Sequence, residues 1–229
     1  MHGFDFEVII RTLPYLFGIG MVFTIKLTVL STIGALLLGT LLAMMRLSSN
    51  RLISGIAGTY VNFLRALPLI LIIFWFYFLV PYIYGWIMGA SGPISIGGFT
   101  SALITFTIFE AAYFCEIMRA GIQSIPRGQI GAGYALGLNY WQMMWHIVLP
   151  QAFRNMTPVI LTQMIVLFQD TSLVYVLSLT DFLGAASNIA QRDGRLVEMF
   201  VFAAVVYFII SYTASRTVKY LQRRMAIVR

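Results

Sequence analysis

Three acidic side chains stand inside long apolar stretches of this sequence: Glu110, Glu116 and Asp170. A charge at the centre of a bilayer costs roughly 2.5–3.5 kcal/mol or more, so such groups face a helix bundle or an aqueous path. No nucleophile–base pair accompanies them, and His2 and His146 lack the spacing of metal ligands. The residues therefore indicate binding and ion pairing rather than an enzyme's chemistry, and we expect no metal site.

Glu116 and Arg119 are three residues apart, so on a helix they can form a structural ion pair. Glu110 lies deeper, one helical turn before Tyr113 and Phe114. Two interpretations of Glu110 remain open: a protonated, hydrogen-bonded core carboxyl, or a side chain lining a path.

Asp170 is surrounded by polar neighbours: Gln169, Thr171 and Ser172, with Gln163 two turns earlier. Midway along an apolar span, such a cluster is the best candidate in the chain for a substrate path. The alternative is a set of hydrogen bonds between spanning helices.

The composition is that of an integral membrane protein. Of 229 residues, 60% are hydrophobic and 10% charged, whereas a soluble domain carries about 25% charged residues. The net charge of +7 does not indicate nucleic-acid binding, because the charges cluster at the edges of apolar spans.

The uncharged stretches predict an all-α membrane protein with one transmembrane domain over residues 1–229. The five expected spans are 27–45, 62–84, 99–118, 155–180 and 199–215. The Gly- and Ser-rich segment 89–98 is the expected turn between the second and the third. Residues 8–25 are also apolar, but Arg11 and Pro14 favour an interfacial helix there over a sixth span.

Lys and Arg predict the orientation, because they are enriched in cytoplasmic loops. One side holds only Arg11, Arg192 and Arg195, with Lys26 near the start of its span. The other side holds Arg46, Arg51, Arg65, Arg119, Arg127, Arg154, Arg216, Lys219, Arg223, Arg224 and Arg229. We therefore expect an external N-terminus, a cytoplasmic C-terminus and a cytoplasmic loop at 120–153.

Within that loop, residues 131–150 read GAGYALGLNYWQMMWHIVLP. The pattern predicts a short helix over 129–136 ended by Gly137, then a second helix capped by Asn139 with Gln142 completing a capping box. The second helix is apolar all round, which is typical of a buried helix. It either packs on the protein's own bundle or docks into a cytoplasmic partner.

The loop resembles the EAA loop of ABC transporter permeases. Gly131, Ala132 and Gly133 occupy the Glu-Ala-Ala positions, Gly137 the following glycine, and Ile147, Leu149 and Pro150 the Ile-x-Leu-Pro ending. The resemblance implies a coupling helix on which these residues and Trp141 contact an ATPase. The motif's glutamate is Gly131 here, so any polar contact that glutamate makes is missing from this chain.

Other segments resemble permeases of the polar amino-acid uptake family (histidine/glutamine/arginine/opine type), closest to glutamate/aspartate-type subunits: YVNFLRALPL at 60–69, AAYFCEIMRAGIQSIPRGQ at 111–129 and DTSLVYVLSLTDFL at 170–183. The resemblance implies a type I ABC importer permease fold in a bacterial inner membrane. It also implies a second permease subunit, expected to differ from this one, two ATP-binding subunits and a periplasmic substrate-binding protein. No GxxxxGK[ST] loop occurs in the sequence, so ATP is expected to be hydrolysed by another chain.

For such a permease the expected substrate is an acidic amino acid, with another polar amino acid or an opine as the alternative. Asp170 would then accept the substrate's ammonium group, and Gln169, Thr171 or Ser172 would donate to its carboxylate. An ion-coupled secondary transporter is the alternative from a different class, but the internal repeat common in those proteins is not found.

Overall fold

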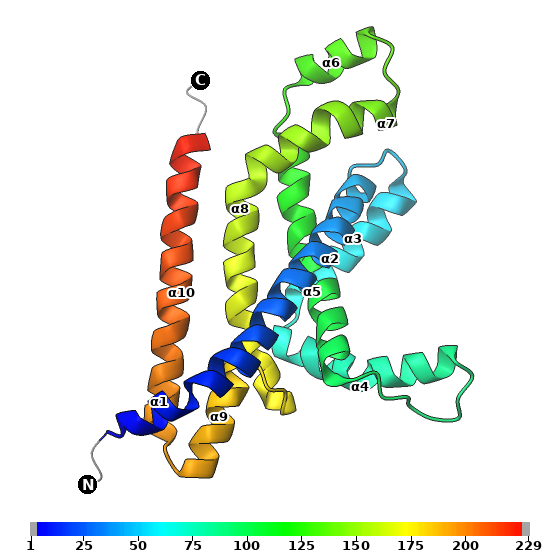
Figure 1. Cartoon of the computed structure of the whole chain (residues 1–229). Coiled ribbons are helices and arrows are strands. Elements are labelled where there is room, and N and C mark those ends of the chain that lie inside the picture. The colour runs from blue at the N-terminus through cyan, green and yellow to red at the C-terminus, as the bar shows by residue number, and fades with distance from the viewer. Residues whose placement is uncertain (1–3, 226–229) are drawn as a thin grey trace.

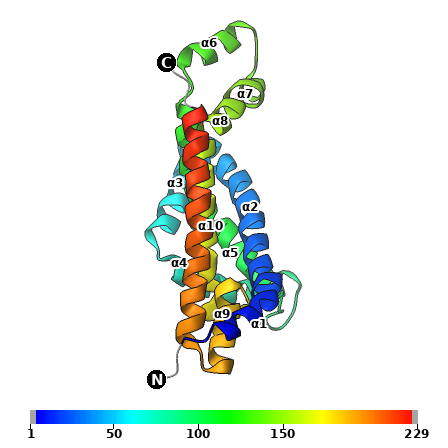
Figure 2. The ribbon, with the colours of Figure 1, turned by 60° about the vertical axis from the view of Figure 1, so that its left-hand side comes forward.

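The computed structural model describes residues 4–225, which contain helices and no strand. The α-helices are α1 (Phe6–Tyr15), α2 (Val22–Arg46), α3 (Arg51–Ala66), α4 (Leu69–Ile87), α5 (Gly98–Gln123), α6 (Arg127–Ala135), α7 (Tyr140–Met143), α8 (Leu149–Asp170), α9 (Phe182–Asp193) and α10 (Leu196–Met225). Two π-helical segments, η1 (Leu16–Met21) and η2 (Met144–Val148), and a 3-10 segment, η3 (Thr171–Leu177), complete the order. Helices α2, α5, α8 and α10 run lengthwise through the molecule (Figures 1 and 2).

Five helices in this described part are long and apolar enough to cross a membrane, which confirms the predicted number. The first of them runs without a break from Phe6 to Arg46. Residues 8–25 are therefore not a sixth span but lead directly into the first one, as α1 and η1. Their interfacial position stays a prediction. Pro14 lies inside α1 and is followed at once by η1, because proline has no N–H to donate and disturbs the regular i→i−4 ladder.

The predicted second span at 62–84 is present with different bounds, Leu69–Ile87, because the chain breaks at Leu67 and Pro68. Leu67 is extended, with φ −101° and ψ 143°, as expected of a residue that precedes proline. Helix α3 ends at Ala66 and α4 starts at Leu69, lying crosswise to the lengthwise helices in Figure 1. This break decides where Arg65 lies.

The predicted fourth span at 155–180 also has different bounds. From Tyr140 to Leu177 the chain is one continuous helical segment, made of α7, η2, α8 and η3. Asp170 is the last residue of α8 rather than a mid-span residue, and the second loop helix is the first part of the same continuous segment, which bends between α7 and α8 (Figure 1).

The core lies between α2 and α5, which have the most extensive contact of any two elements. Small buried residues, including Ala35 and Gly39 on α2 and Ala111 and Ala112 on α5, let the two helices approach closely. Helix α9 is joined to the same bundle at the other end, where the N–H of Phe182 donates to the hydroxyl of Thr24 on α2 at 3.0 Å. The buried Asp181 caps α9 through the N–H groups of Leu183 and Gly184. This packing holds α5 as a rigid support for the side chains described below.

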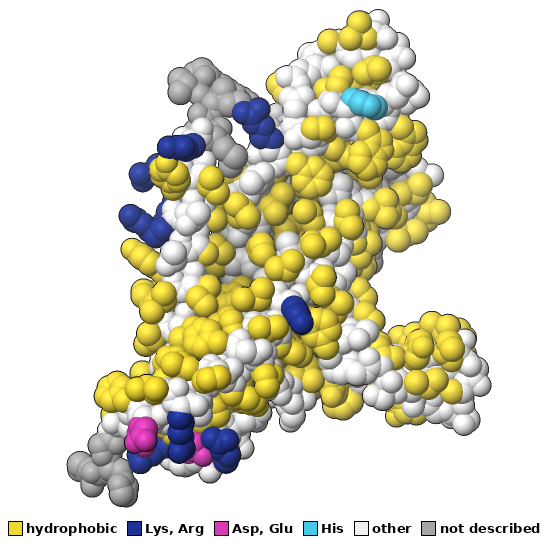
Figure 3. Space-filling model, viewed as in Figure 1, with side chains coloured by type: hydrophobic (Ala, Val, Ile, Leu, Met, Phe, Trp, Pro, Cys, Tyr) yellow, Lys and Arg dark blue, Asp and Glu magenta, His cyan; other side chains and the backbone are white. Residues whose placement is uncertain are grey.

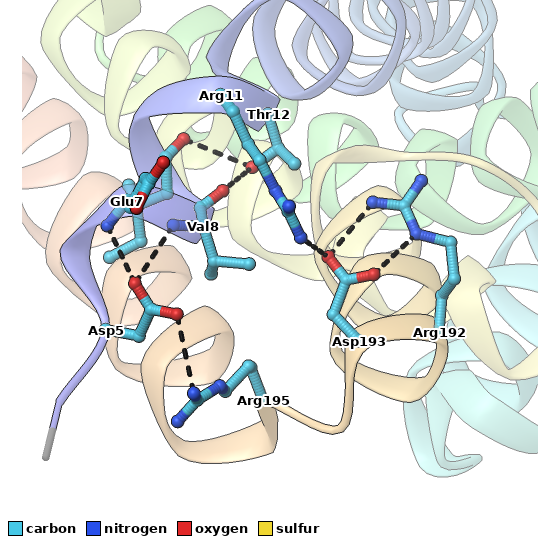
Figure 4. A network of polar contacts seen from close by, with 9 residues as sticks. Asp5, Glu7, Val8, Arg11, Thr12, Arg192, Asp193 and Arg195 are labelled. Carbon is cyan, nitrogen blue, oxygen red and sulfur yellow. Dashed lines mark hydrogen bonds and ion pairs between the residues drawn. The ribbon is translucent and has the colours of Figure 1, made fainter. Parts of the chain in front are cut away.

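The two ends of the molecule differ in charge. Basic side chains gather at the C-terminal end of α10 in the view of Figure 3, whereas at the end near the N-terminus they are mixed with acidic ones. There Asp193 accepts from Arg11 at 2.7 Å and pairs with Arg192 at 2.8 Å, which ties α1 to α9 (Figure 4). Arg192 and Arg11 lower the pKa of Asp193 to about 2, so the contact stays ionised at neutral pH.

Candidate functional site

Glu110 occupies the middle of α5 and is completely buried. Its Oε2 accepts a hydrogen bond from Nε2 of Gln163 on α8, at 2.9 Å. Its Oε1 is buried without a hydrogen-bond partner among residues 4–225. An unsatisfied buried oxygen of this kind is costly, which makes Glu110 the most prominent open acceptor between α5 and α8.

Asp170 follows Gln163 by seven residues, about two turns, so both lie on one face of α8. Asp170 and Ser172 are half-buried, and Gln169 is exposed. Thr171 is buried, and its hydroxyl donates to the Phe168 carbonyl at 2.7 Å. The structure thus brings Glu110 and Gln163 together and places Asp170 farther along the same helix, while Thr171 is satisfied locally.

Arg65 belongs to this region, although its charge predicted a place at the cytoplasmic edge. It follows Arg51 by 14 residues on α3, a distance of about 21 Å along the helix. Its guanidinium lies 5.4 Å from the ring centroid of Tyr113, one turn beyond Glu110 on α5. Tyr60 donates to the Ile108 carbonyl at 2.6 Å and holds α3 against α5 at this level.

The sequence contained a signal for this place of Arg65. The Ala-Leu-Pro sequence at 66–68 favours a helix end directly after Arg65. A helix that starts at Asn50, whose side chain caps α3, therefore places Arg65 at the far end of α3.

Glu116 contacts two arginines rather than one. Its Oε2 accepts from Nη2 of Arg119 at 2.6 Å, and its Oε1 pairs with Arg46 at the end of α2. The group therefore joins α2 to α5 through a shared carboxylate.

The loop helices form as the sequence predicts. Helix α6 ends in a Schellman turn, in which Leu138 N–H donates to the Gly133 carbonyl at 3.1 Å and Gly137 N–H to Tyr134 at 2.9 Å. Gly137 has φ +80°, a conformation that favours glycine. Asn139 and Gln142 form the predicted capping box, which is confirmed.

The residues at the Glu-Ala-Ala positions differ in surroundings. Gly131 and Ala132 are exposed, whereas Gly133 is buried. A Cβ at Gly133 would meet the end of the Met143 side chain, including Sδ at 2.8 Å, so α6 packs closely on the second loop helix. A Cβ at Gly131 would meet nothing within 4 Å.

The second loop helix is only half buried, contrary to the expectation from its apolar composition. Met144 and Val148 pack into the core cluster, as does Met143. Trp141 and Trp145 are 60% and 63% exposed at the tip of the molecule that α6 and α7 form (Figure 1). Two large exposed indoles on one helix face are typical of an interface core.

The Ile-x-Leu-Pro ending joins this tip to the bundle. Ile147 is half-buried and Leu149 is buried in the core, while Pro150 is exposed in the first turn of α8. Proline is tolerated there because the first helical N–H groups have no partner within the helix.

Residues 35–227 match the family of binding-protein-dependent transport system inner membrane components. The chain belongs to this family. Membership confirms the resemblance predicted from the loop, and the protein is a multi-pass inner membrane component of a binding-protein-dependent transport system.

Relatives of this inner membrane component cover it almost completely. The glutamate/aspartate import permease protein GltK of Escherichia coli O157:H7 is 53% identical over 226 residues, which is 99% of this chain and 100% of GltK. The arginine transport system permease protein ArtQ of Bacillus subtilis (strain 168) is 31% identical, over 96% of this chain and 97% of ArtQ.

Solved structures of transporters share the fold of this inner membrane component. The crystal structure of an amino acid ABC transporter with histidines has a chain with a TM-score of 0.79 and 29% identity, covering 96% of this chain and 98% of its own. An inward-facing structure of the MetNI methionine ABC transporter has a TM-score of 0.74 at 18% identity, over 99% and 100% of the two chains. These likenesses confirm the predicted ABC importer permease fold.

Proposed function

We propose that this inner membrane component is the permease of an ATP-driven importer for an acidic amino acid, and that it works by alternating access. The observation that carries the proposal is the unbroken helix from Tyr140 to Leu177. One end of it bears the exposed Trp141 and Trp145, and its other half bears Gln163 and Asp170. A push on the tip would therefore move the polar site directly.

The site offers complementary groups for an amino acid with two carboxylates. Glu110 is completely buried in this structure, so its unpaired Oε1 would accept from the ammonium group only when α5 and α8 move apart during alternating access, with the half-buried Asp170 as a second acceptor along the path. Arg65 presents a guanidinium, which binds carboxylates in a bidentate manner. The half-buried Ser172 and the exposed Gln169 are further donors, and the 53% identity to GltK favours glutamate and aspartate.

Arg65 gives the test of this substrate class. We expect Arg65→Gln to lower glutamate uptake by about tenfold or more, because hydrogen bonds to charged groups are worth about 1.5–3 kcal/mol. Arg65→Lys should keep part of the activity, since it keeps the charge but not the bidentate geometry. Uptake of radiolabelled glutamate by both variants, with unlabelled aspartate and arginine as competitors, measures the two effects.

Arg51→Gln is the matched control, because Arg51 is an exposed arginine at the other end of α3. It should transport normally. Unchanged uptake by Arg65→Gln, or competition by arginine as strong as that by aspartate, would contradict the proposed substrate class.

The proposed importer contains further subunits for this permease to contact, beginning with the ATP-binding subunits at the α6–α7 tip. Two ATP-binding subunits hydrolyse ATP, and one of them docks on the α6–α7 tip. A second permease subunit of different sequence and a periplasmic binding protein complete the importer. Gly131 leaves an exposed gap where the family's motif has glutamate, so docking here rests on the apolar side chains of the tip, Trp141 and Trp145 above all.

We place the N-terminus in the periplasm and the C-terminus in the cytoplasm, on the strength of the basic end of α10. A cysteine at Ser91, exposed between α4 and α5, should react with an impermeant thiol reagent in intact cells. A cysteine at Gln129, exposed on α6, should react only after permeabilisation. Both variants carry Cys115→Ala, and the opposite labelling pattern would overturn the orientation.

A further inference from the structure

An open groove of about 730 Å³ lies between α2, α8 and α10, away from Glu110 and Arg65. Its lining is almost wholly apolar and includes Ile25 on α2, Ile165 and Phe168 on α8, and Ile210 and Val218 on α10. The volume is within the range of about 300–1,000 Å³ that small-molecule sites have. Water finds few partners on such walls, so the groove suits a hydrocarbon chain.

The groove is elongated along the membrane-spanning direction. On α10 it extends from Ile209 to Leu221, or about 18 Å, against a hydrocarbon core of about 30 Å. Along α10 it reaches toward the C-terminal end, whereas its walls on α2 and α8 are residues 21–29 and 161–168, in the halves of those helices away from that end. A chain that enters at the C-terminal end of α10 would therefore extend into the middle of the membrane.

Two arginines stand at that end of the groove. Arg154 precedes the lining residue Leu161 by seven positions on α8, which puts it on the same helix face. Arg224 follows the lining residue Leu221 by three positions on α10. Both side chains are exposed, and Arg224 belongs to the last turn of α10.

We propose that this groove binds an anionic phospholipid, with an acyl chain along the apolar walls and the phosphate held between Arg154 and Arg224. Basic pockets between spanning helices on the cytoplasmic side bind the head groups of anionic lipids. Ser211 lines the groove 13 positions before Arg224 on α10, about 20 Å along the helix, so the acyl chain rather than the head group would pass it.

Charge favours a lipid over a helix of a neighbouring subunit as the occupant. The cytoplasmic ends of spanning helices are rich in Lys and Arg, so a second permease helix would bring positive charge against Arg154 and Arg224. The phosphate of an anionic lipid brings the opposite charge to the same place.

Native mass spectrometry of the full-length chain, with the subunits that co-purify, tests the proposal. We expect one phosphatidylglycerol to be retained per chain, in preference to phosphatidylcholine. The double variant Arg154→Gln/Arg224→Gln should weaken phosphatidylglycerol retention about thirtyfold, since two cationic contacts are lost. Ala214→Trp, which fills the groove, should abolish retention of either lipid.

Arg216→Gln/Lys219→Gln removes the same charge from the opposite face of α10 and should change retention less than twofold. Equal retention of the two lipids by the unmodified protein would overturn the proposal without any variant. So would an equal loss in the control, or a cross-link to another subunit from the variant Ala214→Cys, which would show that a helix covers the groove.

Discussion

Gly137→Val should abolish uptake while the protein still reaches the membrane in normal amount. The side chain itself has room, because a Cβ at this position meets nothing within 4 Å. The backbone is the obstacle: φ is +80°, which a β-branched residue adopts only at a cost of order 1–3 kcal/mol. The turn between α6 and α7 would rearrange and lose the bonds to Gly133 and Tyr134.

The consequence reaches the proposed ATPase contact, because this turn aims Trp141 and Trp145. The spanning helices insert by their own hydrophobicity and do not depend on it. We therefore expect the ATPase subunit to be lost during purification of the variant, and transport-coupled ATP hydrolysis to disappear. Quantitative immunoblotting of membranes, pull-down of the ATPase and uptake in the same cells measure the three effects.

Gly137→Asn is the matched control, because asparagine is tolerated in the left-handed conformation far better than valine. It should keep most of the uptake and hold the ATPase. Normal transport by Gly137→Val, with the ATPase bound, would show that the tip is not the coupling element.

Glu110→Gln should lower uptake at least tenfold without lowering the amount of assembled complex. The amide keeps the shape of the carboxylate and an oxygen that accepts from Gln163, so the contact between α5 and α8 survives. What disappears is the negative charge offered to the substrate's ammonium group, and hydrogen bonds to charged groups contribute about 1.5–3 kcal/mol. Initial uptake rates, normalised to complex purified from the same membranes, measure the effect.

Asp170→Asn should have a smaller effect of the same kind, because Asp170 is only half-buried at the end of α8. Glu7→Gln serves as the control for removal of a carboxylate, since Glu7 is exposed in the first turn of α1. A core role for Glu110 would give the reverse outcome for Glu110→Gln, with little assembled complex but normal uptake per complex.

Composition and uncharged stretches were enough to predict five spanning helices, because hydrophobic length is a local property of the sequence. Capping was equally predictable: Asn139 with Gln142, and Gly137, act through backbone groups a few residues away. Both kinds of signal are short-range.

The errors arose where the position of a residue depends on a helix end or on a tertiary contact. The break at Pro68 moved Arg65 from the expected cytoplasmic edge to the neighbourhood of Tyr113. The prediction separated the loop helix from the fourth span, whereas the structure joins them through η2. The partnership of Glu110 with Gln163 spans 53 positions of sequence, and no local pattern specifies it.

Transport in proteoliposomes tests the central claim most directly. The purified complex of this chain with its co-purifying subunits would be reconstituted, and the binding protein loaded with radiolabelled glutamate would be added outside. We predict accumulation that requires ATP inside the vesicles and persists when ionophores remove every ion gradient. Accumulation without ATP that collapses with an ion gradient would contradict the account and identify a secondary transporter instead.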